Sequence, residues 1–493
     1  MRKLPGIRRL VVLLLLVPSA ARGQADPWYQ TDFPPEEVQS RWAGVFDQIE
    51  GDAVAVVQGV AMTPGFIYPR QTNEFYFLCG VETPGSYLLL DGRDQTVTLF
   101  LPPRNARLES AEGRVLSAED VDLARRLIGV DEVRSTESMR GEWLNGAEGR
   151  APAVIYTPFS PAEGSGQSRG EIVGANAGIA SDYWDGRISR EAHLAALLKA
   201  RNTRADVRDL SPVLDELRSI KSPREIALIR RASQLAGLGL LEAMRASRPG
   251  VFEYQLDAAA RYVFLVNGAR LEGYRSITAA GTDNIWNIHY FRNTGELRSG
   301  DLVLMDYAPD YRYYTSDVGR MWPVNGTFTP QQRELLGFVL EYRNAVLERI
   351  RPGVTPQQIQ EEAALAMEAV FDRWSFSKPS YEEAARTLVR SGGGVFSHTV
   401  GMAVHDVGRY NRAPLQPGQV FAVDPQLRVP EESLYIRYED LVVVTETGVE
   451  NFHAFLAADL DQIEKIVKED GIVQRFPPTP ESASRGGVES GNR

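Results

Sequence analysis

The chain has 493 residues, of which 43% are apolar and 24% charged, and this is the balance of a globular protein with two or three domains. Its formal net charge is −11, and it has no dense run of lysine and arginine with interleaved aromatic residues, so we expect no nucleic-acid partner. The single cysteine, Cys79, excludes an intrachain disulfide and a thiolate metal site, and its apolar neighbours indicate buried packing.

The first 23 residues have the pattern of a cleaved signal peptide. A basic region between Arg2 and Arg9 precedes an apolar core from Leu10 to Val17, and small residues follow before Gln24. Because this core is shorter than the roughly 20 residues of a membrane-spanning helix, cleavage is favoured over a retained anchor. We therefore expect an exported protein, periplasmic or secreted, with no membrane attachment after signal cleavage.

Residues 35–215 are expected to form an α/β domain. Short β-type runs, separated by Gly, Pro and Asp-Gly breakers, predict strands at residues 53–57, 86–90 and 97–101. Helical patterns alternate with these strands at residues 35–50, 118–128 and 189–200. The segment 159–170 is rich in Ser, Gly and Pro and is predicted to be a surface loop.

A second domain is expected over residues 216–465. It opens with a capping box, in which Ser222 is the N-cap, Pro223 takes the first helical position and Glu225 the third. This pattern predicts a helix to about residue 247, a second helix over 253–267, strands beyond it and a helical region over 330–374. Residues 476–493 are rich in Pro, Ser, Gly and charge, which predicts a disordered tail.

Two aspartates in this second domain are the first candidate metal ligands. Asp306 ends the strand-like run Gly300–Asp306, and a turn through Pro309–Arg312 leads to a run that contains Asp317. A hairpin centred between Tyr311 and Arg312 would place Asp306 directly opposite Asp317, with Cβ atoms roughly 4.5–5.5 Å apart. Two carboxylates this close repel one another unless a proton or a cation lies between them, so the pair predicts a metal site.

Three of the five histidines lie beside acidic and glycine residues in the same half of the chain, which also contains two further candidate acids. The histidines are His289, His398 and His405, and the acids are Asp424 and Glu439, which end apolar runs where an unpaired carboxylate is costly. Imidazole with several carboxylates suits Mn, Fe, Co or Zn, and five ligands around two ions leave room for a bridging water. Each such residue taken singly is more often structural, and that interpretation is kept for His193 and His453.

The motifs around these residues resemble the creatinase/aminopeptidase P superfamily. The similar segments are Leu304-Met305-Asp306, Ser316-Asp317-Val318-Gly319-Arg320, Ser397-His398, Val404-His405-Asp406-Val407-Gly408 and Ile436-Arg437-Tyr438-Glu439-Asp440. The likeness extends to Asn73–Gly80 and to the linker Ile220–Glu225, so it covers residues from about 35 to 460. It implies an α/β N-terminal creatinase-like domain followed by an α+β catalytic domain with the pita-bread fold.

The resemblance also implies a role for each residue. Asp306 would bind one of two divalent metal ions, His398 and Asp424 would bind the other, and Asp317 and Glu439 would bridge the two. Mn²⁺ is the first expectation for these ions, with Zn²⁺, Co²⁺ and Fe²⁺ as alternatives. The catalytic residues would be His289 and His405, which line the substrate site, Arg437 near its prolyl side, and Asp424 as a proton relay. The implied reaction is attack of a metal-bridged hydroxide on the peptide bond before proline.

Three departures separate this sequence from the family pattern. Asp424 replaces a glutamate, which shortens its reach by roughly 1.5 Å. Gly394 replaces a histidine four residues before the ligand His398. Gln426 and Arg428 replace a glycine and a tyrosine, and Arg428 is expected to change what the prolyl pocket accepts.

The leading interpretation is a Xaa-Pro aminopeptidase, an exopeptidase that acts on proline-containing peptides. One alternative is a prolidase, which cleaves Xaa-Pro dipeptides and shares the same ligands. Another is a catalytically weakened binding protein on the same fold, which the change at Asp424 keeps open. A metal-free hydrolase resembling creatinase is disfavoured because Asp306, Asp317 and Glu439 are all retained. Homo-oligomers are common among similar proteins, and this chain is expected to share that property by analogy alone.

Overall fold

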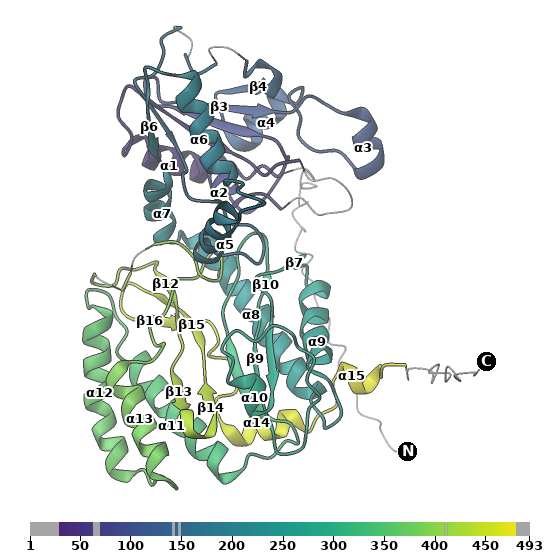
Figure 1. Cartoon of the computed structure of the whole chain (residues 1–493), viewed down its shortest axis with the longest axis vertical. Helices are drawn as coiled ribbons and strands as arrows, with labels where there is room; N and C mark the ends of the chain where they lie inside the picture. Colours follow the sequence, from purple (N-terminus) through teal and green to yellow (C-terminus); the bar gives the residue numbers. More distant parts are fainter. Residues whose placement is uncertain are drawn as a thin grey trace, which may run out of the picture.

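The computed structural model describes residues 29–62, 70–140, 143–145, 149–408, 410–411 and 413–479. The predicted signal peptide and residues 480–493 of the predicted tail lie outside the described residues. The chain folds into two bodies, which lie one above the other in Figure 1 and are connected through helices α7 (Ser211–Ser219) and α8 (Pro223–Ala246). Within the described ranges, no helix is long and apolar enough to cross a membrane.

The N-terminal body is built on one mixed sheet with the strand order β4-β3-β2-β1-β5-β6. Its central strand β1 pairs antiparallel with β2 and parallel with β5. All six residues of β1 are buried, because alternate side chains pack into two different apolar clusters on the two faces of the sheet. The strands are β1 (Ala53–Gln58), β2 (Tyr87–Asp91), β3 (Thr96–Leu101), β4 (Glu132–Ser135), β5 (Val154–Thr157) and β6 (Asp206–Asp209).

Helices cover both sides of this sheet, apart from α3 (Ala106–Glu112), which has no buried residue, and one helix that projects into solvent. The covering helices are α1 (Pro35–Phe46), α2 (Asn73–Cys79), α4 (Val121–Ile128) and α6 (Arg190–Arg201). Helix α2 contains the apolar run around Cys79, and the thiol is fully buried, as expected. Burial raises the pKa of the Cys79 thiol, so the side chain packs as an inert apolar group.

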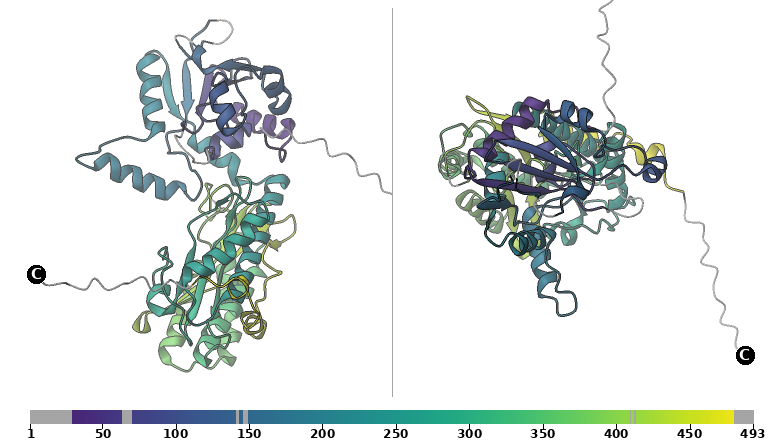
Figure 2. Two further views of the ribbon diagram at one scale, coloured as in Figure 1. Left: turned by 90° about the vertical axis from the view of Figure 1, so that its right-hand side faces the viewer. Right: turned by 90° about the horizontal axis from the view of Figure 1, so that it is seen from above.

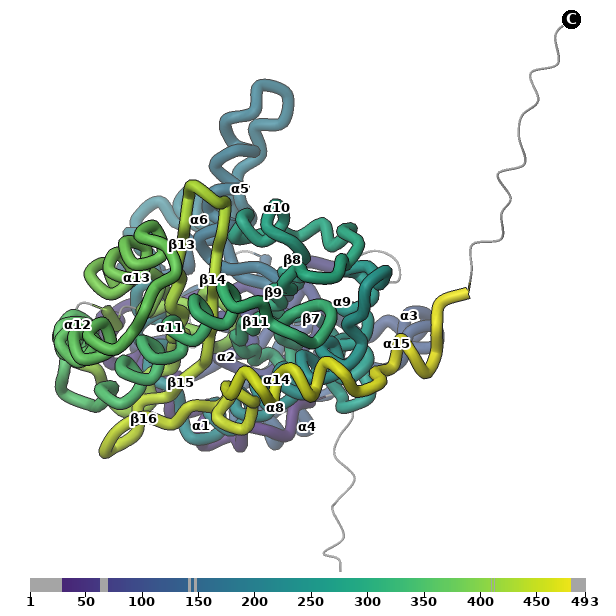
Figure 3. Tube along the Cα trace, turned by 90° about the horizontal axis from the view of Figure 1, so that it is seen from below, coloured from purple at the N-terminus to yellow at the C-terminus, as the bar shows by residue number. Residues whose placement is uncertain are grey.

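The projecting helix is α5 (Arg169–Ser181), none of whose residues is buried. Figures 2 and 3 show it standing out from the rest of the molecule. The prediction of a surface loop over residues 159–170 is wrong at two points. Glu163 is fully buried in the loop, and α5 has already begun at Arg169.

The C-terminal body consists of small antiparallel sheets between two groups of helices. One three-stranded sheet has the order β11-β9-β8, another has the order β12-β15-β16, and β13 and β14 form a two-stranded ribbon. A further short pair joins β7 (Leu271–Glu272) to β10 (Pro309–Asp310). The strands of the main sheets are β8 (Ile277–Ala280), β9 (Leu302–Asp306), β11 (Gly319–Pro323), β12 (Val420–Val423), β13 (Gln426–Val429), β14 (Leu434–Arg437), β15 (Asp440–Val444) and β16 (Val449–Asn451).

The helices of this body bury one continuous apolar core against the sheets. They are α8, α9 (Glu253–Val266), α10 (Gly281–Ile285), α11 (Pro330–Leu347), α12 (Pro356–Arg373), α13 (Pro379–Ser391), α14 (Leu460–Val467) and α15 (Ile472–Arg475). The helical region predicted over 330–374 is present as α11 and α12, while α13 was not predicted. The capping box of α8 is confirmed, because Ser222 Oγ accepts the Glu225 N–H at 3.2 Å and the Glu225 carboxylate accepts the Ser222 N–H at 2.8 Å.

The two bodies meet at the tip of the hairpin that follows β9. Arg70 Nε donates to Asp310 Oδ2 at 2.7 Å. The rings of Tyr76 and Tyr313 stack with their centroids 3.4 Å apart. Tyr76 belongs to the N-terminal body and Tyr313 to the hairpin, so the N-terminal body holds this tip by a charge pair and a stacked ring pair.

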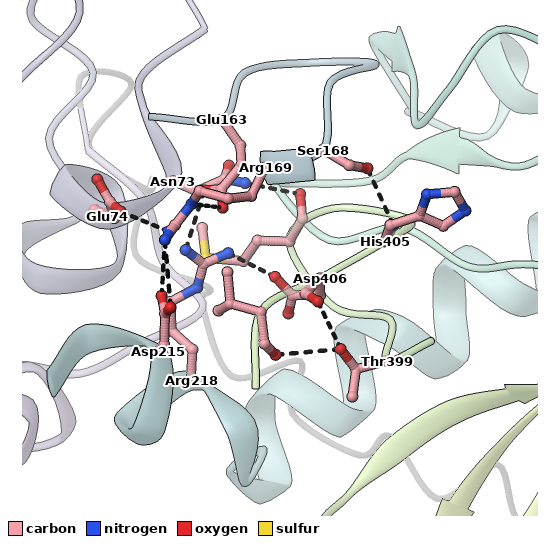
Figure 4. A network of polar contacts seen from close by, with 12 residues as sticks. Asn73, Glu74, Glu163, Ser168, Arg169, Asp215, Arg218, Thr399, His405 and Asp406 are labelled. Atoms are coloured by element: carbon pink, nitrogen blue, oxygen red, sulfur yellow. Dashed lines mark hydrogen bonds and ion pairs between the residues drawn. The ribbon is translucent and has the colours of Figure 1, made fainter. Parts of the chain in front are cut away.

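A second contact between the bodies is a buried charge network, shown in Figure 4. Arg218 of α7 donates to Glu163 at 3.1 Å and to Asp406 at 2.6 Å. Arg169, at the start of α5, donates to Glu163 at 2.9 Å and to Glu74 of α2 at 2.7 Å. The network therefore ties the N-terminal body, α5 and α7 to the loop of the C-terminal body that contains Asp406.

Candidate metal centre

The first two predicted ligands lie on the hairpin between β9 and β11. Asp306 is the last residue of β9, and it pairs with Gly319 rather than with Asp317, so the predicted register is wrong by two residues. The turn is centred between Arg312 and Tyr313, which have φ values of +54° and +73°. Two residues with positive φ are typical of a type I′ hairpin turn, which usually contains glycine or asparagine, and here neither is present.

The two aspartates still converge, because a shift of two residues leaves Asp317 on the same face of the hairpin as Asp306. The hydroxyl of Tyr274 donates to Asp306 Oδ1 at 2.5 Å and lies 3.1 Å from Asp317 Oδ1. Tyr274 therefore links the two carboxylates. The sequence offered no motif that distinguished this tyrosine from the others.

Three of the five predicted ligands form one compact cluster. Ligand atoms of Asp317, His398 and Glu439 all lie within 4.8 Å of one another. His398 Nε2 is 3.2 Å from Asp317 Oδ2, while its Nδ1 is 3.2 Å from the carbonyl oxygen of Thr399. A backbone carbonyl at Nδ1 fixes the ring so that Nε2 faces the carboxylates, as is common for metal-binding histidines.

The other two predicted ligands, Asp306 and Asp424, lie beside this cluster and are held by Arg437. Its guanidinium nitrogens are 2.8 Å from Asp306 Oδ2, 2.8 Å from Asp424 Oδ1 and 2.6 Å from Glu439 Oε2. Gln426 Nε2 donates to the second oxygen of Asp424. Both oxygens of Asp424 are thus bound by donors of the protein itself.

Buried negative charge is in excess at this centre. Four carboxylates surround one guanidinium, and all four are almost completely buried. Burial raises the pKa of Asp306 and of Glu439 above the usual range, against the lowering effect of Arg437. Burial would also raise the pKa of Asp317, but the hydrogen bond and charge of His398 outweigh it and hold the pKa low.

These features fit a divalent cation. Oxygen donors with one imidazole suit the first-row metals and zinc. Glu439 Oε1 is buried and has no hydrogen-bond partner among the described residues, although a buried carboxylate oxygen normally has one. A cation at the Asp317, His398 and Glu439 cluster would satisfy this oxygen and offset the excess negative charge.

The two remaining predicted histidines lie on the open side of the cluster. The ring centroid of His405 is 4.2 Å from that of His398 and 6.3 Å from that of His289. His289 is exposed and His405 is partly buried. Burial, together with the charge of His398, lowers the pKa of His405.

His405 is held by two residues of the N-terminal body that sequence reasoning missed. Its backbone N–H donates to Ser168 Oγ at 3.1 Å, as Figure 4 shows, and its Nδ1 lies 2.9 Å from Glu171 Oε1. Both residues lie at the base of α5, more than 230 positions away in the sequence. Because no local motif marks such a contact, only the tertiary structure reveals it.

The residues at the departures from the family pattern lie next to Asp424. Gly394 has φ of +80°, and a Cβ atom at this position would lie 2.5 Å from the carbonyl oxygen of Asp424. No histidine fits there in this backbone. Arg428 lies between the rings of Trp286 and Tyr435, at 5.3 and 4.6 Å from their centroids.

The two histidines that were interpreted as structural lie away from this open side. His193 is exposed on α6. His453 is fully buried, and its Nδ1 accepts the backbone N–H of Leu441 at 3.1 Å.

Comparison with known proteins gives two family matches. Residues 227–446 match metallopeptidase family M24, and residues 40–156 match the aminopeptidase P N-terminal domain. The Xaa-Pro aminopeptidase of Escherichia coli (strain K12) is 31% identical over 458 residues, which are 88% of this chain and 97% of that protein. The Xaa-Pro aminopeptidase of Haemophilus influenzae is 28% identical over 461 residues, which are 89% of this chain and 99% of that protein.

Solved structures agree with these matches. Aminopeptidase P from E. coli with the inhibitor Pro-Leu has a TM-score of 0.69 and 29% identity, and the match covers 89% of this chain and 99% of that one. The zinc-substituted E. coli protein in complex with product matches with the same TM-score and coverage.

Proposed function

Because this chain belongs to metallopeptidase family M24, with the pita-bread catalytic domain and the N-terminal domain of the aminopeptidase P type, we propose that it is a Xaa-Pro aminopeptidase. It would hydrolyse the bond between the N-terminal residue of a peptide and a following proline. The observation that carries the proposal is the buried cluster of Asp317, His398 and Glu439, with Asp306 and Asp424 beside it.

Two divalent metal ions are the proposed cofactors, with Mn²⁺ first and Zn²⁺, Co²⁺ and Fe²⁺ as alternatives. Asp317, His398 and Glu439 offer the ligand atoms of one compact site, and Asp306 and Asp424 would complete the set for two ions. The zinc-substituted structure of the E. coli relative supports a metal site in this family. When bound, such ions lower the pKa of a water molecule and polarise the carbonyl group of the scissile bond.

The residues around the cluster orient the substrate and move protons. His405 has its Nδ1 at Glu171, which leaves Nε2 available to hydrogen-bond the scissile carbonyl or the leaving nitrogen. His289 offers a second imidazole on the same open side. Asp424 is the proposed proton acceptor, and Arg437 keeps it in place through the 2.8 Å contact.

The test combines metal analysis with peptide cleavage. The protein, expressed without residues 1–23, would be analysed for bound metal and assayed with Xaa-Pro dipeptides and Xaa-Pro-Yaa tripeptides in the presence of Mn²⁺. Asp424→Glu would be measured in parallel, and His398→Ala would serve as the variant that loses a ligand. We expect close to two metal ions per chain, cleavage before proline, and loss of both properties in His398→Ala.

A catalytically weakened binding protein is the second candidate, favoured by one observation. Both oxygens of Asp424 are bound by Arg437 and Gln426, which competes with any role of that carboxylate as a ligand or proton acceptor. Metal without cleavage, restored by Asp424→Glu, would show that the shorter side chain has slowed a real active site. Absence of metal and cleavage in both proteins would reject the peptidase proposal in favour of this candidate. Cleavage of dipeptides alone would identify a prolidase.

We also propose that the protein is exported and acts in the periplasm or outside the cell. The basic and apolar pattern of residues 2–17 supports this proposal. Cell fractionation of the full-length chain, with N-terminal sequencing of the mature protein, would test it, and we expect the mature chain to begin at Gln24. A homo-oligomer is proposed by analogy with similar proteins, and its mass in solution can be measured on the same sample.

A further inference from the structure

One face of the ribbon formed by β13 and β14 continues beyond the metal centre. The register pairs Gln426 with Arg437 and Arg428 with Tyr435. Leu427 and Ile436, which lie between these residues, point to the other face of the ribbon, so the four side chains share one face, on which Tyr435 is itself fully buried. Gln426 and Arg437 contact Asp424. Arg428 therefore lies two residues farther along this face, about 7 Å from Gln426 at 3.3 Å of rise per residue.

Arg428 has aromatic neighbours but no anionic partner in the part of the chain that the structure describes. Its guanidinium lies between the rings of Trp286 and Tyr435. Among the described residues, the buried Nη2 of Arg428 and the buried hydroxyl of Tyr435 have no hydrogen-bond partner. The neighbouring Arg437 has three carboxylate partners. A buried guanidinium nitrogen without a hydrogen-bond acceptor is energetically costly. We therefore expect an acceptor from outside the described residues to bind Arg428.

The position of Arg428 points to the substrate as the source of that acceptor. Trp286 directly follows α10 and lies three residues before His289, the exposed histidine on the open side of the metal centre. The guanidinium of Arg428 thus extends from the ribbon to Trp286, in a segment that borders the open side of the metal centre. A peptide advances at most 3.3–3.6 Å per residue, so this guanidinium is within reach of groups one or two residues beyond the scissile bond.

We propose that Arg428, together with the Tyr435 hydroxyl, binds a carboxylate of the substrate on the leaving-group side. The fork of N–H donors in a guanidinium matches the two oxygens of a carboxylate. The favoured substrates are then short peptides whose chain ends at proline or at the residue after it. An acidic side chain at the residue after proline supplies the same chemistry. This inference rests on the proposed peptidase function.

Three tripeptide substrates test the inference on the purified protein with added Mn²⁺. They are Ala-Pro-Ala as the free acid, its C-terminal amide, and Ala-Pro-Glu amide. For the unmodified protein we expect kcat/KM to be about 10- to 100-fold higher for the acid than for the amide, the range for a hydrogen-bonded charge pair. Activity restored with Ala-Pro-Glu amide would show that a side-chain carboxylate also binds.

Arg428→Gln should lower the acid-to-amide ratio of kcat/KM to about 1, while Arg428→Lys should retain part of the preference. The matched control is Arg386→Gln, which changes an exposed arginine of α13 that pairs with Glu382, and it should leave the preference intact. Circular dichroism and metal content would establish that each variant is folded. If Arg428→Gln does not fold, the acid-to-amide ratio of the unmodified protein still decides the matter.

Equal kcat/KM for acid and amide in the unmodified protein would overturn the inference while leaving the peptidase proposal intact. Cleavage of none of the three peptides would instead reject the peptidase proposal. In that case calorimetric titration with Pro-Ala and with Pro-Ala amide decides the inference separately. Tighter binding of the acid, lost in Arg428→Gln, would support it, and equal binding of both would reject it.

Discussion

His453 is a buried histidine whose hydrogen bonds require the neutral ring. Its Nδ1 accepts the Leu441 N–H at 3.1 Å, and its Nε2 lies 3.4 Å from Ser316 Oγ. Burial lowers the pKa of His453 to about 3. In the unfolded chain a histidine titrates near pH 6.5, so below this pH the unfolded state binds more protons than the folded state.

The contribution of His453 to stability is therefore complete above about pH 6.5 and is lost as the pH falls towards 3. The expected slope from this residue is at most about 1.4 kcal/mol per pH unit. Urea unfolding between pH 7 and pH 5 should show a smaller loss of stability for His453→Gln than for the unmodified protein. His193→Gln, an exposed change on α6, is the control. If the free energy of unfolding changed with pH to the same extent in all three proteins, His453 would not be the neutral buried group inferred from its hydrogen bonds.

At the scale of single residues, the sequence predicted which acidic and imidazole side chains lie together better than it predicted the residues that support them. Asp317 is distinguished by its predicted place on the hairpin opposite Asp306, and Glu439 by its place at the end of an apolar run, where an unpaired carboxylate is costly. With His398 these two form the compact cluster. Tyr274 and Glu171 orient such groups, but a tyrosine in a loop and a glutamate in an exposed helix are ordinary in sequence. The engagement of Asp424 by Arg437 and Gln426 also depends on side-chain geometry that no spacing predicts.

Among the elements, α5 has a role that its exposure does not suggest. Its first turn places Glu171 Oε1 2.9 Å from His405 Nδ1. Replacement by glutamine removes the carboxylate that fixes this ring. We expect Glu171→Gln to lower kcat on Xaa-Pro-Yaa peptides by about 10- to 100-fold, the usual effect of losing an outer partner of a site histidine, with a smaller change in KM.

Asp185→Asn is the matched control for Glu171→Gln, because it removes an exposed carboxylate just beyond the end of the same helix. Glu171→Asp, which keeps the charge, should retain more activity than the glutamine variant. A purely structural role for Glu171 would change thermal stability and leave kcat and KM of the folded enzyme as they were.

In the hairpin between β9 and β11, the strand could be predicted from the sequence but the exact position of the turn could not. The strand that the sequence predicts before this turn is present as β9, and all five of its residues are buried, as expected for a short apolar run that is covered on both faces. The turn centre was one residue off, because the positive φ values fall on Arg312 and Tyr313, where the sequence carries no glycine. Contacts of Tyr313 with the N-terminal body accompany this conformation, and such contacts are not visible in a local pattern.

Across the whole molecule, the two bodies share buried charge at Arg218. This side chain is 1% exposed and pairs with Glu163 of the N-terminal body and Asp406 of the C-terminal body. Its removal leaves two buried carboxylates with less compensation. We expect Arg218→Ala to lower the free energy of unfolding by about 3–5 kcal/mol, as found when one partner of a buried ion pair is removed.

The measurement for Arg218→Ala is chemical unfolding followed by tryptophan fluorescence and circular dichroism. Arg208→Ala is the control, since Arg208 pairs with Glu50 and Asp206 on the exposed edge of the N-terminal sheet, and it should leave the transition in place. Separate transitions for the two bodies in Arg218→Ala would show that the network couples them. An unchanged midpoint would mean that the network adds little to the stability.

The two-domain fold could be predicted from the sequence because the family resemblance spans most of the chain. The α/β domain followed by the pita-bread domain agrees with the family matches and with the E. coli structure. The buried contacts between the two bodies could not be predicted from the sequence. Glu163 lies in a segment whose Ser, Gly and Pro content predicted a surface loop, and its burial depends on two arginines from other elements.

The contacts between the N-terminal body and the tip of the β9–β11 hairpin have a consequence for how such proteins evolve. The hairpin carries both Asp306 and Asp317, and Arg70 and Tyr76 of the N-terminal body hold its tip. A recombination event that exchanged one half of the gene would deliver a catalytic half without the stacking partner of Tyr313. The two halves are therefore expected to be inherited as a unit, and new specificities to arise by point substitutions on the β13–β14 ribbon, where Gln426 and Arg428 already stand.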